Sequence, residues 1–335
     1  MTKTIKLLGC VALAYMMLTA ASCKKKNEVI VTSNDIVTPV GPQFNPDSAY
    51  AYCAAQCEFG PRIMNSDAHE KCGKWIAEKF KQMGCDVELQ KAALTGYDGT
   101  MYNATNIIAR SNPDATRRIL LCAHWDSRPW ADNDPDSANW RNPVMAANDG
   151  ASGVAVMLEV ARLLSLNDSL NLGVDFVCFD AEDCGVPQWE DNSTEDTWCL
   201  GSKYWANNYQ PKGSKPMFGI LLDMVGGQGA SFYQESISMK YASDVVGRVW
   251  NAAEAVGYSS YFVREQAGFV TDDHVYVNQT GLKTIDIISH YPNCKASSFG
   301  PTWHTVNDDM QHIDTNTLKA VGQTIIQVLF SSANE

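Results

Sequence analysis

Five short segments of this chain place a histidine or a carboxylate where an apolar run ends or a polar loop begins. They are His124-Trp125-Asp126, Asn148-Asp149-Gly150, Asp180-Ala181-Glu182-Asp183, Leu222-Asp223-Met224 and Trp303-His304-Thr305. Imidazole and carboxylate groups are ligands that zinc accepts. Because the candidate ligands come from several strand ends, they indicate a buried zinc site in an α/β enzyme and not a zinc finger. Within the set, Glu182 adds a carboxylate suited to proton transfer beside the candidate ligand Asp183.

Each of these residues also has a structural explanation when it is taken alone. Asp149 stands at a predicted helix start, where aspartate is a common N-cap. Glu182 and Asp183 could be two solvated carboxylates, and His304 could be a core histidine. Asp223 is harder to explain, because a carboxylate at the end of an apolar run has to be paired or coordinated. Taken together, the five segments favour the zinc site.

Apolar runs of strand length alternate with helical patterns along the chain. The runs at 119–123, 174–179, 219–222 and 284–288 are typical of strands buried on both faces, and helical patterns cover 48–57, 66–83, 149–164, 245–255 and 315–330. This alternation predicts a three-layer α/β/α fold with a central twisted, mostly parallel (mixed) sheet. Catalytic sites in such sheets lie outside the carboxyl ends of the strands, and three of the five segments directly follow predicted strands.

The first part of the chain has the pattern of an export signal. Residues 1–22 combine two lysines, an apolar run and small residues before Cys23, which is typical of a secretory signal. A cysteine in this place resembles a bacterial lipoprotein box, so we expect lipid on Cys23 and a location in the cell envelope, as a periplasmic or outer-membrane lipoprotein. Ordinary signal cleavage is the alternative. Residues 23–46 have the composition of a tether, which leaves 47–335 as a single zinc-dependent catalytic domain.

Charge and cysteine content narrow the class of protein further. The formal net charge is −12, and an acidic domain of this kind does not bind the phosphate backbone of nucleic acids. The eleven cysteines include no CxxC pair. Cys184 and Cys199 flank a polar loop, and in an exported protein they could close it as a disulfide.

Six stretches of sequence carry a resemblance to a known family. They are His-Trp-Asp-Ser-Arg at 124–128, Asp-Gly-Ala-Ser-Gly at 149–153, Asp-Ala-Glu-Asp at 180–183, Leu-Leu-Asp-Met-Val-Gly at 221–226, Asp-Asp-His at 272–274 and Trp-His-Thr at 303–305. Over about residues 48–333 the chain resembles the zinc aminopeptidase-like family, and within it the glutaminyl-peptide cyclotransferases, or glutaminyl cyclases, of bacterial type. The first four stretches fit the whole family, whereas the last two and the tryptophan-bearing loops favour the cyclases.

The resemblance implies a metal-ligand set. Asp149, Asp183 and His304 would bind one zinc ion and leave its fourth position open, as a catalytic zinc requires. Animal cyclases carry glutamate where Asp183 stands. Aminopeptidases of the family hold a second zinc with residues that match His124 and Asp223. Because this chain has both, a two-zinc aminopeptidase is the alternative interpretation.

The resemblance also implies a reaction and the residues that serve it. Cyclases convert the N-terminal glutamine of peptides and proteins into pyroglutamate with release of ammonia. Glu182 would take a proton from the attacking amine and deliver one to the departing ammonia, while Asp223 and Asp272 would position the amine. Asp286 stands where animal cyclases carry a histidine, so the arrangement there differs. The roles of His124 and Asp126 stay open.

A third implication concerns the substrate pocket. Trp189, Phe299 and Trp303 match positions that line the pocket of cyclases. Core packing is the alternative for any tryptophan, and it suits Trp75 within its helical pattern. Tryptophans in loops rich in proline, asparagine and aspartate are harder to explain as core.

Overall fold

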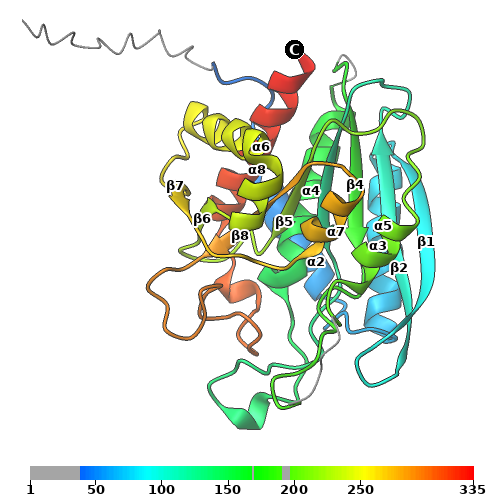
Figure 1. Cartoon of the computed structure of the whole chain (residues 1–335), viewed down its shortest axis with the longest axis vertical. Helices are drawn as coiled ribbons and strands as arrows, with labels where there is room; N and C mark the ends of the chain where they lie inside the picture. The colour runs from blue at the N-terminus through cyan, green and yellow to red at the C-terminus, as the bar shows by residue number, and fades with distance from the viewer. Residues whose placement is uncertain (1–37, 168–169, 191–196) are drawn as a thin grey trace, which may run out of the picture. The chain divides into compact units, whose positions relative to one another are not determined.

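The structure, a computed structural model, describes residues 38–167, 170–190 and 197–335, and in them eight strands form one mixed sheet. The strand order is β1-β2-β4-β3-β5-β8-β6-β7 (Figure 1). Four of the seven neighbouring pairs are parallel, and β1–β2, β2–β4 and β6–β8 are antiparallel. The strands are β1 (Asp86–Thr95), β2 (Met101–Ser111), β3 (Arg118–His124), β4 (Gly173–Phe179), β5 (Gly219–Asp223), β6 (Ser231–Gln234), β7 (Phe262–Gln266) and β8 (Thr284–His290). The predicted mixed, mostly parallel sheet is therefore confirmed.

Helices cover both faces of this sheet, which confirms the predicted three layers. On one face lie α2 (Pro46–Cys57), α3 (Asp67–Gln82), α4 (Ser152–Ser165), α6 (Ser236–Ala255) and α8 (Thr315–Ala333). On the other face lie α5 (Leu200–Asn207) and α7 (Asp273–Gln279). Three short helical turns complete the described elements: η1 (Ser137–Asn139), η2 (Ala147–Ala151) and η3 (Met310–His312).

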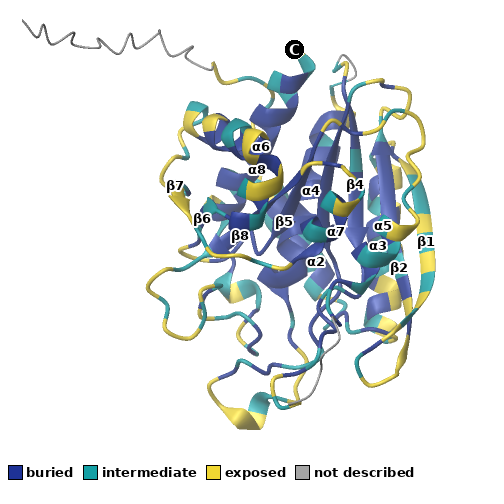
Figure 2. Ribbon diagram, in the orientation of Figure 1, coloured by how far each residue is buried: buried dark blue, intermediate teal, exposed yellow. Residues whose placement is uncertain are grey.

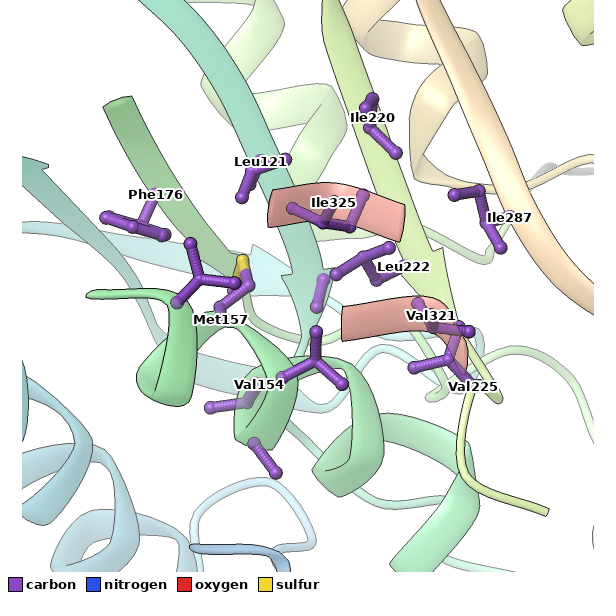
Figure 3. Packing of buried hydrophobic residues seen from close by; sticks show 14 of the residues in the cluster. Leu121, Val154, Met157, Phe176, Ile220, Leu222, Val225, Ile287, Val321 and Ile325 are labelled. Carbon is purple, nitrogen blue, oxygen red and sulfur yellow. The ribbon is translucent and has the colours of Figure 1, made fainter. Parts of the chain in front are cut away.

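The central strands are buried on both sides, as their unbroken apolar runs predict. Every residue of β3 is buried, and the other central strands β4, β5 and β8 are mostly buried (Figure 2). Successive side chains of a strand enter opposite layers. Leu121 packs with Val154 of α4 and Ile325 of α8 in the larger core (Figure 3). Its neighbour Leu120 packs in the smaller core with residues of α5 and α7. A strand clamped in this way holds the residue at its carboxyl end in a defined place.

Two elements, β6 and α7, were not predicted from the sequence, and both are short. β6 has four residues and α7 has seven, which is too few apolar positions to show a period. The helix around Ser66 was predicted correctly, and the Ser66 hydroxyl caps it by accepting the N–H of His69 at 3.1 Å.

The helix predicted to begin at Asp149 begins three residues later, at Ser152. Asp149 has non-helical angles (φ −84°, ψ 94°), and Gly150 has φ +102°. A Cβ on Gly150 would also lie 2.8 Å from the backbone oxygen of Asp126 and 3.0 Å from a ring carbon of His124. Asp149 is therefore not an N-cap; glycine at 150 allows the chain to bend there and to approach the end of β3 closely.

The packed domain begins several residues before the predicted boundary at 47. Phe44 is buried, and its N–H donates to Gln323 Oε1 of α8 at 2.8 Å. The N–H of Val40 donates to Gln327 Oε1 of the same helix at 2.7 Å. The described part of the predicted tether therefore packs on the domain. The predicted signal and Cys23 lie outside the described residues, and no helix within them is long and apolar enough to cross a membrane.

The change Phe44→Ala tests this boundary. Because Phe44 is 2% exposed, we expect the free energy of unfolding to fall by about 3 kcal/mol in urea denaturation. Phe269→Ala is the matched control, since Phe269 is 78% exposed and its loss should change stability by less than about 0.5 kcal/mol. Equal stability of the two variants would mean that the segment around Phe44 behaves as a tether.

Candidate active site

The predicted site residues meet at one edge of the sheet. His124 is the last residue of β3 and Asp223 the last of β5, while Asp180 directly follows β4. Asp149 reaches this edge from η2, and His304 reaches it from the loop that precedes η3. The carboxyl ends of the parallel strands thus bring together residues that are far apart in sequence, as the alternation of elements predicted.

Asp149, Asp183 and His304, the three predicted zinc ligands, form one buried cluster. His304 Nε2 lies 3.2 Å from Asp183 Oδ1 and 3.6 Å from Asp149 Oδ2. One ligand atom from each residue lies within 4.8 Å of the others. The second oxygen of Asp183, Oδ2, is buried without a hydrogen-bond partner among the described residues. A buried carboxylate oxygen without a donor is costly unless a cation satisfies it, and this donor set suits zinc.

A second cluster shares Asp149 with the first. His124 Nε2 lies 2.9 Å from Asp149 Oδ1 and 3.3 Å from Asp223 Oδ1. Asp149 therefore faces a histidine with each of its two oxygens, and the second group could also hold a metal ion. The donor geometry fits one zinc or two.

Asp126 supports the site from behind. Its carboxylate oxygens accept the backbone N–H groups of Glu182 at 3.0 Å and Asp183 at 3.1 Å. His124 Nδ1 lies 3.5 Å from the same carboxylate. Asp126 thus orients a histidine and the Glu182-Asp183 turn, which is the positioning role that second-layer carboxylates have around metals.

Two further supporting carboxylates, Asp308 and Asp132, were missed from the sequence. Asp308 accepts the N–H of Asn148 at 2.7 Å and of Asp149 at 3.0 Å, which fixes the bend that carries Asp149. Asp132 lies 3.6 Å from His304 Nδ1 and accepts the Arg128 Nε–H at 2.7 Å. Both stand in loops rich in aspartate, and no pattern there separates them from their neighbours.

A pocket of about 240 Å³ opens beside the two clusters. Glu182, Asp223 and Asp272 line it together with the aromatic side chains of Phe299 and Trp303. A larger groove between α3 and the β1–β2 pair lies away from these residues. The smaller pocket, next to the candidate ligands, is therefore the candidate substrate site.

Trp189, predicted to line the substrate pocket, is not among the described residues that line this one. Its ring lies edge-on to Trp130 with 6.0 Å between centroids, and the Arg141 guanidinium lies 4.5 Å from its ring centroid. Among the described residues, Trp198 lines the pocket in its place. Trp189 and Trp198 belong to one stretch that the sequence predicts as a loop, and the sequence alone does not tell which of them turns inward.

The aromatic residues also hold a candidate ligand. His304 lies between Trp303, with ring centroids 3.8 Å apart, and Trp198, with centroids 5.9 Å apart and planes 5° from parallel. Trp303 in turn packs against Phe299 at 5.1 Å. The same rings therefore fix the imidazole and give the pocket an apolar wall.

Burial dominates the electrostatics of the acids in the pocket. It raises the pKa of Glu182 well above the usual range, and Asp183 and Asp272 nearby raise it further, against the opposing effect of His124. Burial and its acidic neighbours, against an opposing effect of His124, raise the pKa of Asp223 to about 6, and burial with Asp223 raises that of Asp272 to about 7. Raised pKa values of this kind are typical of the acid–base groups of an active site.

Nine cysteines are described and all are free, so the predicted disulfide between Cys184 and Cys199 is not present. Cys184 Sγ lies 3.6 Å from Asp126 Oδ2, and Cys199 Sγ lies 3.2 Å from Glu182 Oε1. Each thiol contacts a different carboxylate of the site.

Comparison with known proteins decides the family. The model of peptidase family M28 matches residues 106–329, about two thirds of the chain. The chain belongs to peptidase family M28.

Several proteins of known structure are similar to this chain over most of its length. The glutaminyl cyclase of Bacteroides thetaiotaomicron is 47% identical, with a TM-score of 0.84, and the match covers 87% of this chain and 99% of that one. The glutaminyl cyclase of Tannerella forsythia is 49% identical, with a TM-score of 0.84, and the match covers 86% and 99%. A leucine aminopeptidase precursor of Bacteroides thetaiotaomicron is 46% identical, with a TM-score of 0.83 and coverage of 88% and 99%.

Curated relatives are more distant. The match covers 46% of an aminopeptidase from Bacillus subtilis at 26% identity, and 64% of the bovine glutaminyl-peptide cyclotransferase at 24% identity. The chain thus spans about half to two thirds of the length of these relatives.

The pKa values predict how zinc and pH act together on stability. Asp223 and Asp272 keep protons to about pH 6 and about pH 7 in the metal-free fold. In the unfolded chain they would release them near about pH 3.9. The folded state therefore holds more protons between these values, so metal-free stability falls as pH rises through this window. Zinc needs deprotonated ligands, and two predicted ligands have raised pKa values in the metal-free fold: that of Asp183 is raised by burial, and that of His304, which burial alone would lower, is raised by Asp183. The affinity for zinc therefore rises with pH.

We therefore expect zinc to raise the melting temperature of chelator-treated protein more at pH 7.5 than at pH 5. His304→Ala should abolish most of this rise. His312→Ala should keep it, because His312 is 41% exposed and lies outside both clusters. A zinc effect that is equal at both pH values, or one that survives in His304→Ala, would contradict this ligand set.

Proposed function

We propose that this chain is a zinc-dependent glutaminyl-peptide cyclotransferase, which converts the N-terminal glutamine of peptides and proteins into pyroglutamate and ammonia. The observation that carries the proposal is the pocket itself. Buried acids with raised pKa values face an aromatic wall beside the candidate zinc ligands. The similarity to two bacterial glutaminyl cyclases over nearly their whole length supports it.

Asp149, Asp183 and His304 would hold one zinc ion, and their buried cluster with its unpartnered oxygen supports this assignment. Bound there, zinc would supply a Lewis acid that polarises the γ-carboxamide carbonyl of the substrate glutamine. Arg128 and Asp132 support the cluster through His304 and Asp183.

The acids of the pocket would carry the protons. The α-amine nitrogen of the substrate forms a bond to its own γ-carbonyl carbon, and the bond from that carbon to the amide nitrogen breaks. Glu182 takes a proton from the amine and returns one to the leaving nitrogen, which departs as ammonia. Its raised pKa suits a group that both accepts and donates. Asp223 and Asp272 line the same pocket and would hold the amine by its N–H groups.

The aromatic wall supports cyclisation over hydrolysis. Ring closure uses a nucleophile from the substrate itself, so no water molecule is consumed. Trp198, Phe299 and Trp303 line the pocket with apolar surface, which would help to exclude water around a bound substrate.

The first test is direct. Incubation of the zinc-loaded protein with a peptide that begins with glutamine should release ammonia and lower the peptide mass by about 17 Da, faster than the spontaneous reaction. Glu182→Gln should lower kcat by roughly 10²- to 10⁴-fold with zinc content unchanged, because it removes the proton carrier and leaves the ligands. Glu254→Gln, on an exposed side chain, is the matched control. If the wild-type protein does not cyclise the peptide, the proposed function is wrong. If Glu182→Gln keeps its activity, the assignment of proton transfer to Glu182 is wrong.

A two-zinc aminopeptidase is the second candidate, and the cluster of His124, Asp149 and Asp223 favours it. Metal analysis and a peptide assay separate the two. We expect one zinc per chain and no release of N-terminal residues. Two zincs together with release of free amino acids would favour the aminopeptidase.

We also propose that the protein acts in the cell envelope, anchored through lipid on Cys23. The support is the sequence pattern of residues 1–23. Labelling of cells with a lipid precursor should mark the protein, and the label should be lost in Cys23→Ala. An unlabelled wild-type protein would favour ordinary signal cleavage.

A further inference from the structure

We infer that Cys199 is a positioning residue, whose thiol hydrogen holds one oxygen of the Glu182 carboxylate and leaves the other oxygen free for the substrate's amine. This inference rests on the proposed function, in which Glu182 carries the proton. Cys199 Sγ lies 3.2 Å from Glu182 Oε1, within the distance of a hydrogen bond that involves sulfur.

The thiol is the side-chain donor that reaches this carboxylate. In the part of the chain that the structure describes, no other side-chain donor lies within hydrogen-bond distance of Glu182. The nearest ring nitrogen, His124 Nδ1, is 4.0 Å from Oε2. The Glu182 side chain is 12% exposed and lines the pocket, so its free oxygen can meet a ligand. Without the thiol, the carboxylate would turn more freely about its last bonds.

The choice of cysteine at this position is not explained by the helix that it precedes. Cys199 occupies the N-cap of α5, where serine, threonine, aspartate and asparagine are favoured, and its side chain makes no capping hydrogen bond. It also has φ +55°, a left-handed conformation that costs a residue other than glycine about 1 kcal/mol. The side chain contributes to neither feature, and it is turned toward Glu182.

The backbone fixes the thiol in this direction. The N–H of Cys199 donates to the Glu182 carbonyl at 2.9 Å, and the N–H of Leu200 donates to the Ala181 carbonyl at 3.0 Å. A Cβ on Gly201 would lie 2.0 Å from the Asp180 carbonyl oxygen, so the start of α5 is pressed against the end of β4. Because the backbones of Cys199 and Glu182 are hydrogen-bonded to each other, the thiol and the carboxylate stay close together.

The protonation state suits a donor. Burial raises the pKa of the Cys199 thiol well above its usual range, and the carboxylate of Glu182 raises it further. The sulfur therefore carries its hydrogen at neutral pH, and it donates to the carboxylate instead of repelling it as a thiolate would.

Three variants of the full-length, zinc-loaded protein test the inference. Cys199→Ala should lower kcat about tenfold, the size expected when one hydrogen bond that orients a catalytic group is lost, with KM within twofold and zinc content unchanged. Cys199→Ser keeps a donor and should stay within about threefold of the wild-type kcat. Cys178→Ala is the matched control, because Cys178 is an equally buried thiol in the core of β4 with no role at the pocket, and its kcat should be unchanged.

A loss of kcat in Cys199→Ala that serine restores supports the inference. It is overturned if Cys199→Ala keeps the wild-type kcat, if serine is as damaging as alanine, or if Cys178→Ala loses as much. The comparison with Cys178 separates a lost donor from a cavity, since both changes remove one buried sulfur.

Raman spectroscopy gives a readout that does not depend on activity. The S–H stretching band that disappears in Cys199→Ala should lie at lower frequency than the band that disappears in Cys178→Ala, because donation weakens the S–H bond. Equal frequencies would overturn the inference. If the shifted band is present and the wild-type protein does not cyclise glutamine, the hydrogen bond stands and the proposed function fails.

Discussion

The carboxylate of Asp149 is the group on which the rest of the site depends. One of its oxygens lies 2.9 Å from His124 Nε2 and the other 3.6 Å from His304 Nε2, so it joins the two clusters. It can stand there only because Gly150 bends the backbone with φ +102° and Asp308 accepts the N–H of Asp149. A helix started at Asp149 would turn this carboxylate into a cap and leave both histidines without it.

The site concentrates acids in a place where water cannot solvate them. Each carboxylate is therefore protonated, hydrogen-bonded to backbone N–H groups, or placed where a cation would satisfy it. Asp126 and Asp308 belong to the second group, and Asp183 with its unpartnered Oδ2 belongs to the third. Asp272 belongs to the first up to about pH 7, since burial raises its pKa to that value. The low polarity of the pocket makes it costly to bury these acids in their ionised form. The same low polarity raises their pKa values, which suits them to proton transfer, and the aromatic wall maintains it.

Backbone strain gathers around the same place. Seven described residues other than glycine have positive φ, and five of them lie in or next to the site segments: Ala146, Ala181, Cys199, Met224 and His304. Such residues persist only when the surrounding structure holds them, and they are common where side chains must be aimed at a ligand. The β3 and β4 strands, clamped between two layers of helices, provide that support. The clamped strands thus hold several unfavourable backbone turns in place, and these turns orient the acidic side chains of the site.

The sequence alone determined the layers, the central strands and most of the site. Continuous apolar runs identify strands buried on both faces, and a carboxylate after such a run, as at Asp223, has few structural explanations. Motifs local in sequence were enough to name Asp149, Asp183, His304 and Glu182, which the fold brings together.

Only the tertiary structure decided which loop side chains turn inward. It placed Trp198 and not Trp189 at the pocket, packed Phe44 on α8, set Asp308 and Asp132 behind the ligands, and turned the Cys199 thiol to Glu182 instead of to Cys184. The physical reason is the same for each. A strand can be identified from the pattern of apolar residues within its own segment. The direction of a loop side chain, in contrast, depends on contacts with residues that lie far away in the sequence.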